Sequence, residues 1–429
     1  VYYRCEERLR RLIEEAGIAK TLPTYHLRQW FLLHIVGETI GREDHDLPLE
    51  VITKVNQLLS EVVRDNRSLV NQYRRQIKTY IRETRFTQYL RQVESLATSI
   101  LDLLAWIGER GLALRDLKPE NLFVAGNPDE YPAFLNDSKK YSIGLIDVET
   151  AVPIDAEDPV LIPQPQLAGT PLYATPTHLM PNILLLEAYE DMRTILHLQD
   201  WYATIAILFR IVTGENLFGT TAHVFPEIIN RLKLIDPSGP DMTEDVIRIQ
   251  RLFWNSAVAE FQEGMAKNAG DFARVEVAVP AVFVDELRFS LQKEVREIEK
   301  TVARAVAEQS FFNSGDKRRF LKQASAEKIS QMKNKLAQEV ESGEGHLQSQ
   351  VLLYFELLEK FKSRLEHKQR AVAALGSPNP TVSVDQIMEV MFQRVFTTMY
   401  PAHWPELAPK LYGTSAFLAT DITTYQATM

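Results

Sequence analysis

The chain has 429 residues, 45% of them hydrophobic, which is enough for about two or three domains with sizeable cores. Its formal net charge of −9 argues against nucleic acid or an anionic membrane as the main partner, and its single cysteine excludes an internal disulfide framework or a cysteine-based zinc cluster. No apolar run approaches the roughly 18 residues of a membrane span, so we expect a cytoplasmic protein without membrane insertion.

The first 87 residues contain four stretches in which apolar residues recur at helical spacing. These stretches predict helices over 9–13, 27–36, 49–63 and 69–80. The polar run 65–68 separates the last two and predicts that they form an antiparallel hairpin. The histidines of this region, His26, His34 and His45, are scattered, and we interpret them as ordinary helix and loop residues rather than metal ligands.

A further helix is predicted just before a short loop. Its apolar side chains recur at helical spacing and stop at Gly108 and Gly111; they are Leu96, Ile100, Leu103 and Ile107. The loop runs from Arg115 to Leu122 and reads Arg-Asp-Leu-Lys-Pro-Glu-Asn-Leu. Its aspartate, lysine and asparagine place a carboxylate, a cation and an amide in one short loop.

Three more segments follow this loop in order. Two short strands are predicted over 122–124 and 141–146, and the second strand leads into Asp147, Val148 and Glu149. Residues 169–176 read Gly-Thr-Pro-Leu-Tyr-Ala-Thr-Pro. Residues 200–214 begin at Asp200 and form an apolar stretch interrupted by Arg210, which is too short to span a bilayer and predicts a buried core helix.

Together these segments resemble the lower lobe of eukaryotic-type serine/threonine protein kinases, over residues 88–232, about a third of the chain. The resemblance implies that Asp116 accepts the proton of a protein hydroxyl and that Lys118 neutralises the transferring phosphoryl group. It implies that Asn121 and Asp147 hold Mg²⁺ with ATP. It also implies that the Thr170 hydroxyl bridges Asp116 and Lys118.

The resemblance also implies that Asp200 holds the backbone of the catalytic loop, but the sequence departs from the family elsewhere. Leu114 stands where the family has histidine, and Val148 and Glu149 stand where it has phenylalanine and glycine. Because Leu114 and Val148 are both apolar, we expect their packing contact to survive. Glu149 resists backbone conformations that glycine permits, so we expect this triplet to change conformation less readily. Thr177 replaces a glutamate that forms an ion pair in the family.

The upper lobe of a kinase is not recognisable before the loop. Among residues 1–87 the glycines are Gly17, Gly37 and Gly41, which do not form a glycine-rich phosphate loop. Lys54 faintly resembles the strand lysine that binds phosphate, but the residues around it continue a helical pattern. Two explanations stay open: the upper lobe lies outside this chain, or helices have replaced it.

Beyond residue 232 the resemblance fades, and three amphipathic helices are predicted over 287–305, 329–340 and 351–365, with breaks at 313–315 and 343–345. They form either an antiparallel bundle or an intermolecular coiled coil, in which case the chain self-associates through 285–365. Lys317 begins a basic run that we interpret as a solvated helix start. Pro378 and Pro380 predict a linker to a last helix containing Met388, and Trp404 lies in a following loop.

The predicted fold is therefore mainly α: a protein-kinase-like C-terminal lobe with flanking helical hairpins and a helical bundle. We expect a helical N-terminal region over 1–87, the kinase-like lobe over 88–260, the long-helix region over 261–375 and a C-terminal helical segment over 376–429. The predicted function is transfer of the ATP γ-phosphoryl group to a protein hydroxyl. The alternative is a pseudokinase that acts as a binding or scaffolding module. A small-molecule phosphotransferase is disfavoured by residues 169–176, which resemble a platform for a protein substrate.

A regulatory expectation concerns Arg115. In the family this arginine pairs with a phosphate that is added to the activation segment. From Val148 to Gly169 the sole hydroxyl side chain is that of Thr150, whereas Asp155, Glu157 and Asp158 offer permanent carboxylates. We therefore predict that one of these carboxylates pairs with Arg115 and that the segment is ordered without phosphorylation.

Overall fold

The computed structural model describes residues 2–19, 22, 24–36, 47–155, 162, 169–189, 191–235, 242–309, 311–312, 314–340 and 346–400. The chain divides into two compact units, Val1–Tyr89 and Leu90–Met429. The described residues are mainly helical, which confirms the mainly α part of the predicted fold class, and their strands form three two-stranded sheets. The finer division into four domains stays a prediction. Trp404 and the rest of the expected C-terminal loop lie outside the described residues.

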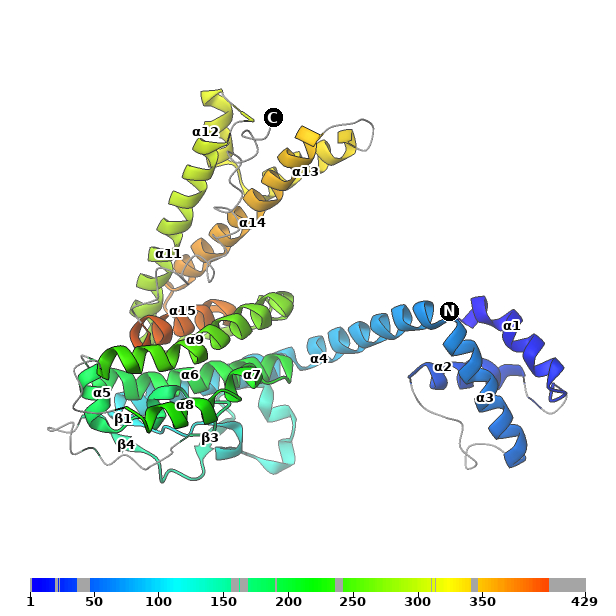
Figure 1. The fold of residues 1–429 in the computed structure, drawn as a ribbon, viewed down its shortest axis with the longest axis horizontal. Coiled ribbons are helices and arrows are strands. Elements are labelled where there is room, and N and C mark those ends of the chain that lie inside the picture. Colours follow the sequence, from blue (N-terminus) through cyan, green and yellow to red (C-terminus); the bar gives the residue numbers. More distant parts are fainter. Residues whose placement is uncertain are drawn as a thin grey trace. The chain divides into compact units, whose positions relative to one another are not determined.

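The first unit is helical throughout its described residues (Figure 1). It contains α1 (Tyr2–Glu15), α2 (Thr24–Val36), α3 (Leu49–Asp65) and the beginning of α4 (Arg67–Glu109). The stripes that predicted these helices form a common core, which includes Leu9, Ile13, Trp30, Phe31, Leu59 and Val62. The prediction that α3 and α4 form an antiparallel hairpin is wrong. One residue, Asn66, separates the two helices, and α3 packs chiefly against α1 and α2.

The sequence predicted two helices where the structure has one. Helix α4 runs for 43 residues from Arg67 to Glu109 and merges the predicted segments 69–80 and 96–107. The residues between those segments contain neither glycine nor proline, so no residue there breaks the helical hydrogen bonding. The helix continues through Gly108 and ends at Glu109, and Gly111 after it has a φ of 60°, a left-handed conformation that glycine adopts easily.

The second unit begins with the lobe for which the sequence predicts a kinase-like fold. Its strands are β1 (Leu112–Ala113), β2 (Leu122–Gly126), β3 (Tyr141–Leu145) and β4 (Val152–Pro153), and its 3₁₀ helices are η2 (Pro119–Asn121), η3 (Pro128–Glu130), η4 (Ala133–Asn136) and η6 (Pro176–Leu179). Its α-helices after α4 are α5 (Asn182–Ala188), α6 (Met192–Thr213), α7 (Gly219–Ala222), α8 (Phe225–Leu232), α9 (Met242–Lys267) and α10 (Ala269–Phe272). The two predicted strands pair as β2 and β3, antiparallel, with Leu122 opposite Leu145.

Helix α6 is the centre of this lobe. Asp191 caps its N-terminus by accepting hydrogen bonds from the backbone N–H groups of Arg193 and Thr194, and Gly214 ends it with a φ of 74°. Among the described residues, α6 is the one helix whose length and composition would suit a membrane span. Its most apolar window is 83% buried inside the unit, which is how a core helix behaves.

The rest of the second unit forms an arm and its attachment. The arm consists of α11 (Ala281–Glu308), α12 (Gly315–Gln323), α13 (Ala326–Val340) and α14 (His346–Ala374), which pack on one another. The predicted stripes are buried in this arm, with Ile298, Val302, Ile329, Leu358 and Phe361 in one core. This is the antiparallel bundle, and the predicted basic run begins α12. Self-association through 285–365 stays a prediction.

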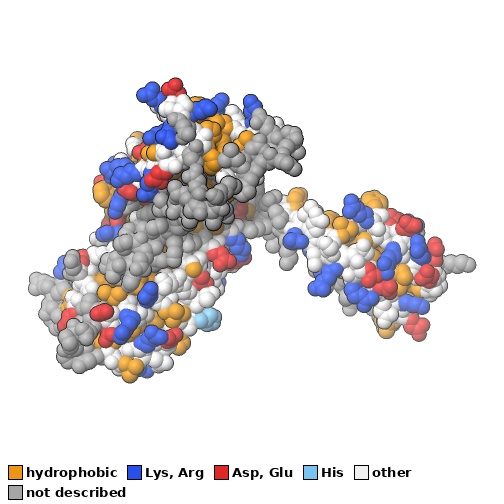
Figure 2. Space-filling view, turned by 45° about the horizontal axis from the view of Figure 1, so that its top comes forward, with side chains coloured by type: hydrophobic (Ala, Val, Ile, Leu, Met, Phe, Trp, Pro, Cys, Tyr) orange, Lys and Arg blue, Asp and Glu red, His pale blue; other side chains and the backbone are white. Residues whose placement is uncertain are grey.

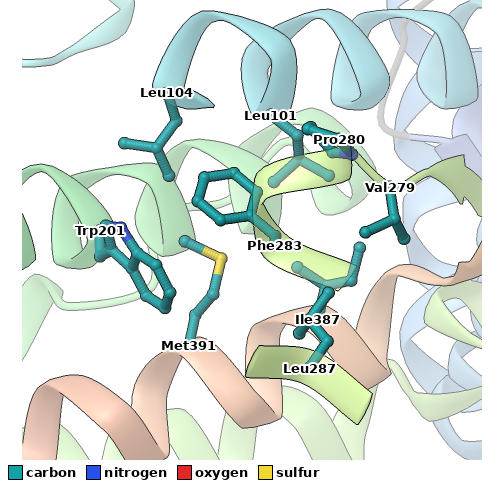
Figure 3. Close-up of a pocket in the computed structure, with 9 residues that line it drawn as sticks. All are labelled: Leu101, Leu104, Trp201, Val279, Pro280, Phe283, Leu287, Ile387 and Met391. Atoms are coloured by element: carbon teal, nitrogen blue, oxygen red, sulfur yellow. The ribbon is translucent and has the colours of Figure 1, made fainter. Parts of the chain in front are cut away.

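The arm joins the lobe through β5 (Glu276–Ala278), β6 (Thr381–Ser383) and α15 (Val384–Met399). Strands β5 and β6 pair antiparallel, and α15 packs along α6. Figure 3 shows a small apolar pocket at this junction, lined by side chains from α4, α6, α11 and α15, with Trp201, Phe283 and Met391 directed toward one another. On the face shown in Figure 2, basic and acidic side chains are interspersed over both units.

Candidate active site

The loop that follows β1 is fixed by a buried carboxylate of α6. Asp200 accepts hydrogen bonds from the backbone N–H groups of Leu114, at 2.7 Å, and Arg115, at 2.9 Å. Burial raises the pKa of Asp200 to about 6, although the two N–H donors and the Arg115 charge act in the opposite direction. Arg115 has a left-handed φ of 66°, which an L-residue holds only where its surroundings enforce it. Asp200 thus binds the backbone of the loop, as the sequence predicted.

The structure brings Asp116, Lys118 and Thr170 together. Lys118 Nζ lies 2.6 Å from Asp116 Oδ2 and donates a second hydrogen bond to Thr170 Oγ1 at 3.0 Å. The Thr170 hydroxyl and backbone N–H both donate to Asp116 Oδ1, at 3.0 and 2.9 Å. The side chains of Lys118 and Asp116 keep 20% and 12% of their surface exposed. This cluster is a partly buried, solvent-reachable group of a carboxylate, an ammonium and a hydroxyl.

Asn121 joins the same cluster. Its amide nitrogen donates to the Asp116 carbonyl at 3.0 Å and to Asp116 Oδ2 at 3.2 Å. These bonds leave Asn121 Oδ1 as an oxygen suited to a magnesium ion. The Asn121 carbonyl accepts the N–H of Ile146 at 2.8 Å, so the pairing of β2 with β3 holds the backbone of Asp147 close to Asn121.

Asp147 itself is exposed and has a left-handed φ of 60°. The structure does not bring its carboxylate into hydrogen-bond contact with the other predicted site residues. Magnesium is commonly held by one or two protein oxygens together with phosphates and water. Asn121 and Asp147 each carry a side-chain oxygen of the kind that such a role needs. No group of three acidic, histidine or cysteine ligands occurs among the described residues.

The residues around the triplet of Asp147, Val148 and Glu149 differ from expectation. Leu114 is buried, but Val148 keeps 53% of its surface exposed, so Val148 contributes little to the packing around Leu114. The predicted apolar contact is therefore weak. Instead, the Thr150 hydroxyl donates to the Leu114 carbonyl at 2.7 Å and links the end of the triplet to the loop.

For Asp155 the regulatory expectation is wrong, because Arg115 contacts other groups, and the expected ordering without phosphorylation stays a prediction. The side chain of Arg115 is buried and donates to Gln199 Oε1 at 3.2 Å and to the His178 carbonyl at 3.4 Å. Burial lowers the pKa of Arg115 to about 10. The carboxylate of Asp155 lies over Gly111 instead, next to the hydrogen bond between the Ile154 N–H and the Gly111 carbonyl. Glu157 and Asp158 lie outside the described residues.

Thr177, which stands where the family has an ion-pairing glutamate, belongs to a buried polar network. Gln199 donates from Nε2 to Thr177 Oγ1 at 3.0 Å while its oxygen accepts from Arg115. Thr175 and His178 form a capping box at the start of η6. Burial lowers the pKa of His178 to about 3, and the nearby Arg115 charge acts in the same direction. The sequence did not predict Gln199, although a glutamine within an apolar helix signals a buried hydrogen-bonding role.

Sequence reasoning also missed a surface cluster beside the loop. Arg210 of α6 donates from Nη1 to Glu120 Oε1 at 3.2 Å and to the Tyr173 hydroxyl at 3.0 Å. Glu120 belongs to the loop of residues 115–122, and Tyr173 to the segment that carries Thr170. The one signal for this cluster was the arginine within the otherwise apolar stretch of residues 200–214.

Lys54 takes no place in this site. It lies in the first unit, where its Nζ donates to the Ala16 carbonyl at 3.3 Å, just beyond the end of α1. That contact is a helix C-terminal interaction of the kind that lysine commonly makes. Before β1, no strand or glycine-rich loop occurs among the described residues.

Comparison with known proteins gives a distant relationship. The chain is 30% identical over 186 residues to the serine/threonine-protein kinase PknF of two Mycobacterium tuberculosis strains and of Mycobacterium bovis. The match covers 43% of this chain and 34% of the relatives' length. No protein-family model matches the chain, and no solved structure matches it. A kinase-like relationship is what these matches support.

Proposed function

We propose that this chain contains the catalytic lobe of a serine/threonine protein kinase, which transfers the ATP γ-phosphoryl group to a protein hydroxyl. The observation that carries the proposal is the hydrogen-bonded cluster of Asp116, Lys118, Thr170 and Asn121. The distant relationship to PknF supports it. We keep a cytoplasmic location, and a protein rather than nucleic acid as the partner, as parts of the proposal.

The proposed chemistry assigns one task to each side chain. The acceptor hydroxyl oxygen bonds to the γ-phosphorus, the bond to the ADP oxygen breaks, and the hydroxyl proton passes to Asp116. Lys118 offsets the charge of the transferring group. When bound, magnesium would neutralise phosphate charge at Asn121 and Asp147.

The contacts of Asp116 suggest how its carboxylate becomes available. Among the described residues, Oδ1 accepts from Thr170, through its N–H and its hydroxyl. Oδ2 accepts from Lys118 and Asn121, the two residues that we assign to the phosphoryl group and the metal. Movement of those two donors toward their proposed targets leaves Oδ2 free for the acceptor hydroxyl, while Thr170 keeps the carboxylate oriented.

A pseudokinase is the second candidate, and one observation favours it. The described residues before β1 are helical and contribute no recognisable ATP-binding strand or glycine-rich loop. A scaffold would use the lobe as a binding surface and would have no chemical need for the Asp116 cluster. The two candidates differ in whether any acceptor is phosphorylated.

The test compares two substitutions of Thr170 at high Mg-ATP concentration. The acceptors are a basic protein and an acidic protein. The measurement is the radiolabelled phosphate that is transferred from ATP to each acceptor. Thr170→Val removes the hydroxyl that touches Asp116 and Lys118, so transfer falls by about 10-fold to 100-fold. Thr170→Ser keeps the hydroxyl and serves as the matched control, with near-normal transfer. Absence of transfer by the wild type would favour the pseudokinase, and equal transfer by Thr170→Val would remove the cluster from the mechanism.

A further inference from the structure

Arg210 connects the two segments that form the proposed active site. Glu120 lies between Lys118 and Asn121 in the catalytic loop, and Tyr173 lies three residues after Thr170. Arg210 Nη1 donates to Glu120 at 3.2 Å and to the Tyr173 hydroxyl at 3.0 Å, so its guanidinium lies at the surface where both segments meet. Because Glu120 and Tyr173 belong to the two segments that carry Lys118 and Thr170, a protein segment that presents a hydroxyl to Asp116 would come close to this surface.

The guanidinium retains unused hydrogen-bonding capacity. Arginine has five N–H donors, and the two bonds of Arg210 both come from Nη1. The side chains of Arg210 and Glu120 are 41% and 59% exposed, whereas Arg115 is buried and Lys118 is held by Asp116. Arg210 is thus the most exposed of these cations around the loop, and two acceptors already fix its orientation. A preorganised guanidinium favours a bidentate carboxylate partner.

We propose that Arg210 recognises an acidic side chain of the protein segment that carries the target hydroxyl, and that Glu120 is its resting partner. This inference rests on the proposed function, because it names the substrate class of the same site. The substrate carboxylate binds the free Nε and Nη2 donors or takes the place of Glu120. Glu120 therefore competes with acidic substrates, and its removal strengthens their binding.

The experiment measures binding without ATP. The probes are two fluorescein-labelled twelve-residue peptides with a central serine, flanked by glutamates in one and by lysines in the other, and the readout is fluorescence anisotropy. The wild type binds the glutamate peptide about fivefold more tightly, near the upper range for an exposed ion pair, and added salt reduces the difference. Glu120→Gln increases this preference. Arg210→Gln abolishes or reverses it, because Glu120 is then left without its partner.

Arg248→Gln is the matched control. Arg248 is an exposed arginine of α9 that pairs with Asp245 on its own helix, so this change removes the same charge elsewhere and leaves the preference unchanged. The inference is overturned if Arg210→Gln keeps the glutamate preference or if Glu120→Gln weakens binding of the glutamate peptide. Charge-dependent binding without any phosphate transfer would reject the proposed function but not the acidic recognition. Transfer with indifference to peptide charge would reject the recognition alone.

Discussion

Replacing Asp200 with asparagine separates what this carboxylate does for the loop from what it costs the fold. Asp200→Asn keeps the shape of the side chain, but the amide has one oxygen and accepts one of the two backbone N–H groups. The other N–H, of Leu114 or of Arg115, is left without an acceptor, which destabilises the fold by about 1–3 kcal/mol. Against this, the rise of the Asp200 pKa from 3.8 to about 6 means that the buried charge costs about 3 kcal/mol. The two effects nearly cancel, so we expect the free energy of unfolding at pH 7 to change by less than about 2 kcal/mol.

The pH dependence gives this prediction its sign. The native wild type binds the Asp200 proton more tightly than the unfolded chain, so the wild type loses stability as pH rises from 3.8 to about 6. Asp200→Asn lacks this loss. The stability of the wild type relative to the variant therefore falls by about 2 kcal/mol between pH 4 and pH 7, measured by urea unfolding with tryptophan fluorescence. A difference that does not change with pH would refute the reasoning, and Asp137→Asn, at an exposed position, is the control.

Three further outcomes are expected. His178 has a pKa of about 3 in the fold, against 6.5 ordinarily, so the native state binds fewer protons than the unfolded chain. The free energy of unfolding therefore falls as the pH drops below 6.5. His178→Gln should remove about 2 kcal/mol of that loss at pH 5, which unfolding measurements at pH 5 and pH 7 would show. Lys368 is fully buried between Glu294, at 2.6 Å, and Glu389, at 2.8 Å, so Lys368→Ala should destabilise the second unit by about 3–5 kcal/mol, whereas exposed Lys360→Ala should not. Calorimetric titration of the 429-residue chain should give a dissociation constant for Mg-ATP in the millimolar range or weaker, and low-micromolar affinity would mean that the helical first unit contributes a nucleotide site.

The site was predictable where its residues lie in short, local motifs. Asp116, Lys118 and Asn121 share one loop, and that loop has little freedom once Asp200 binds its backbone. Thr170 lies 54 residues after Asp116, and a motif of its own marked it. The chemical roles of these residues stay predictions, since the structure shows their arrangement and not their reaction.

Features that depend on packing between distant segments were not predictable. Strands β5 and β6 pair across roughly a hundred residues and are not joined by a hairpin turn. Pairing over so long a span leaves no local pattern in the sequence. The burial of Arg115 against Gln199 depends on how α6 meets the loop, so the sequence assigned it an acidic partner instead. The continuous α4 was missed because apolar periodicity lapses between its two stripes, although nothing there breaks a helix.

The most direct test of the central claim is phosphate transfer by the wild type and by Asp116→Asn at saturating Mg-ATP. The substitution keeps the volume of the side chain but removes the carboxylate that contacts Thr170 and Lys118 and that we propose as the proton acceptor. The account predicts measurable phosphorylation of serine or threonine by the wild type and a loss of about 10²-fold to 10⁴-fold in the variant, with unfolding unchanged. Equal transfer by both proteins would contradict it.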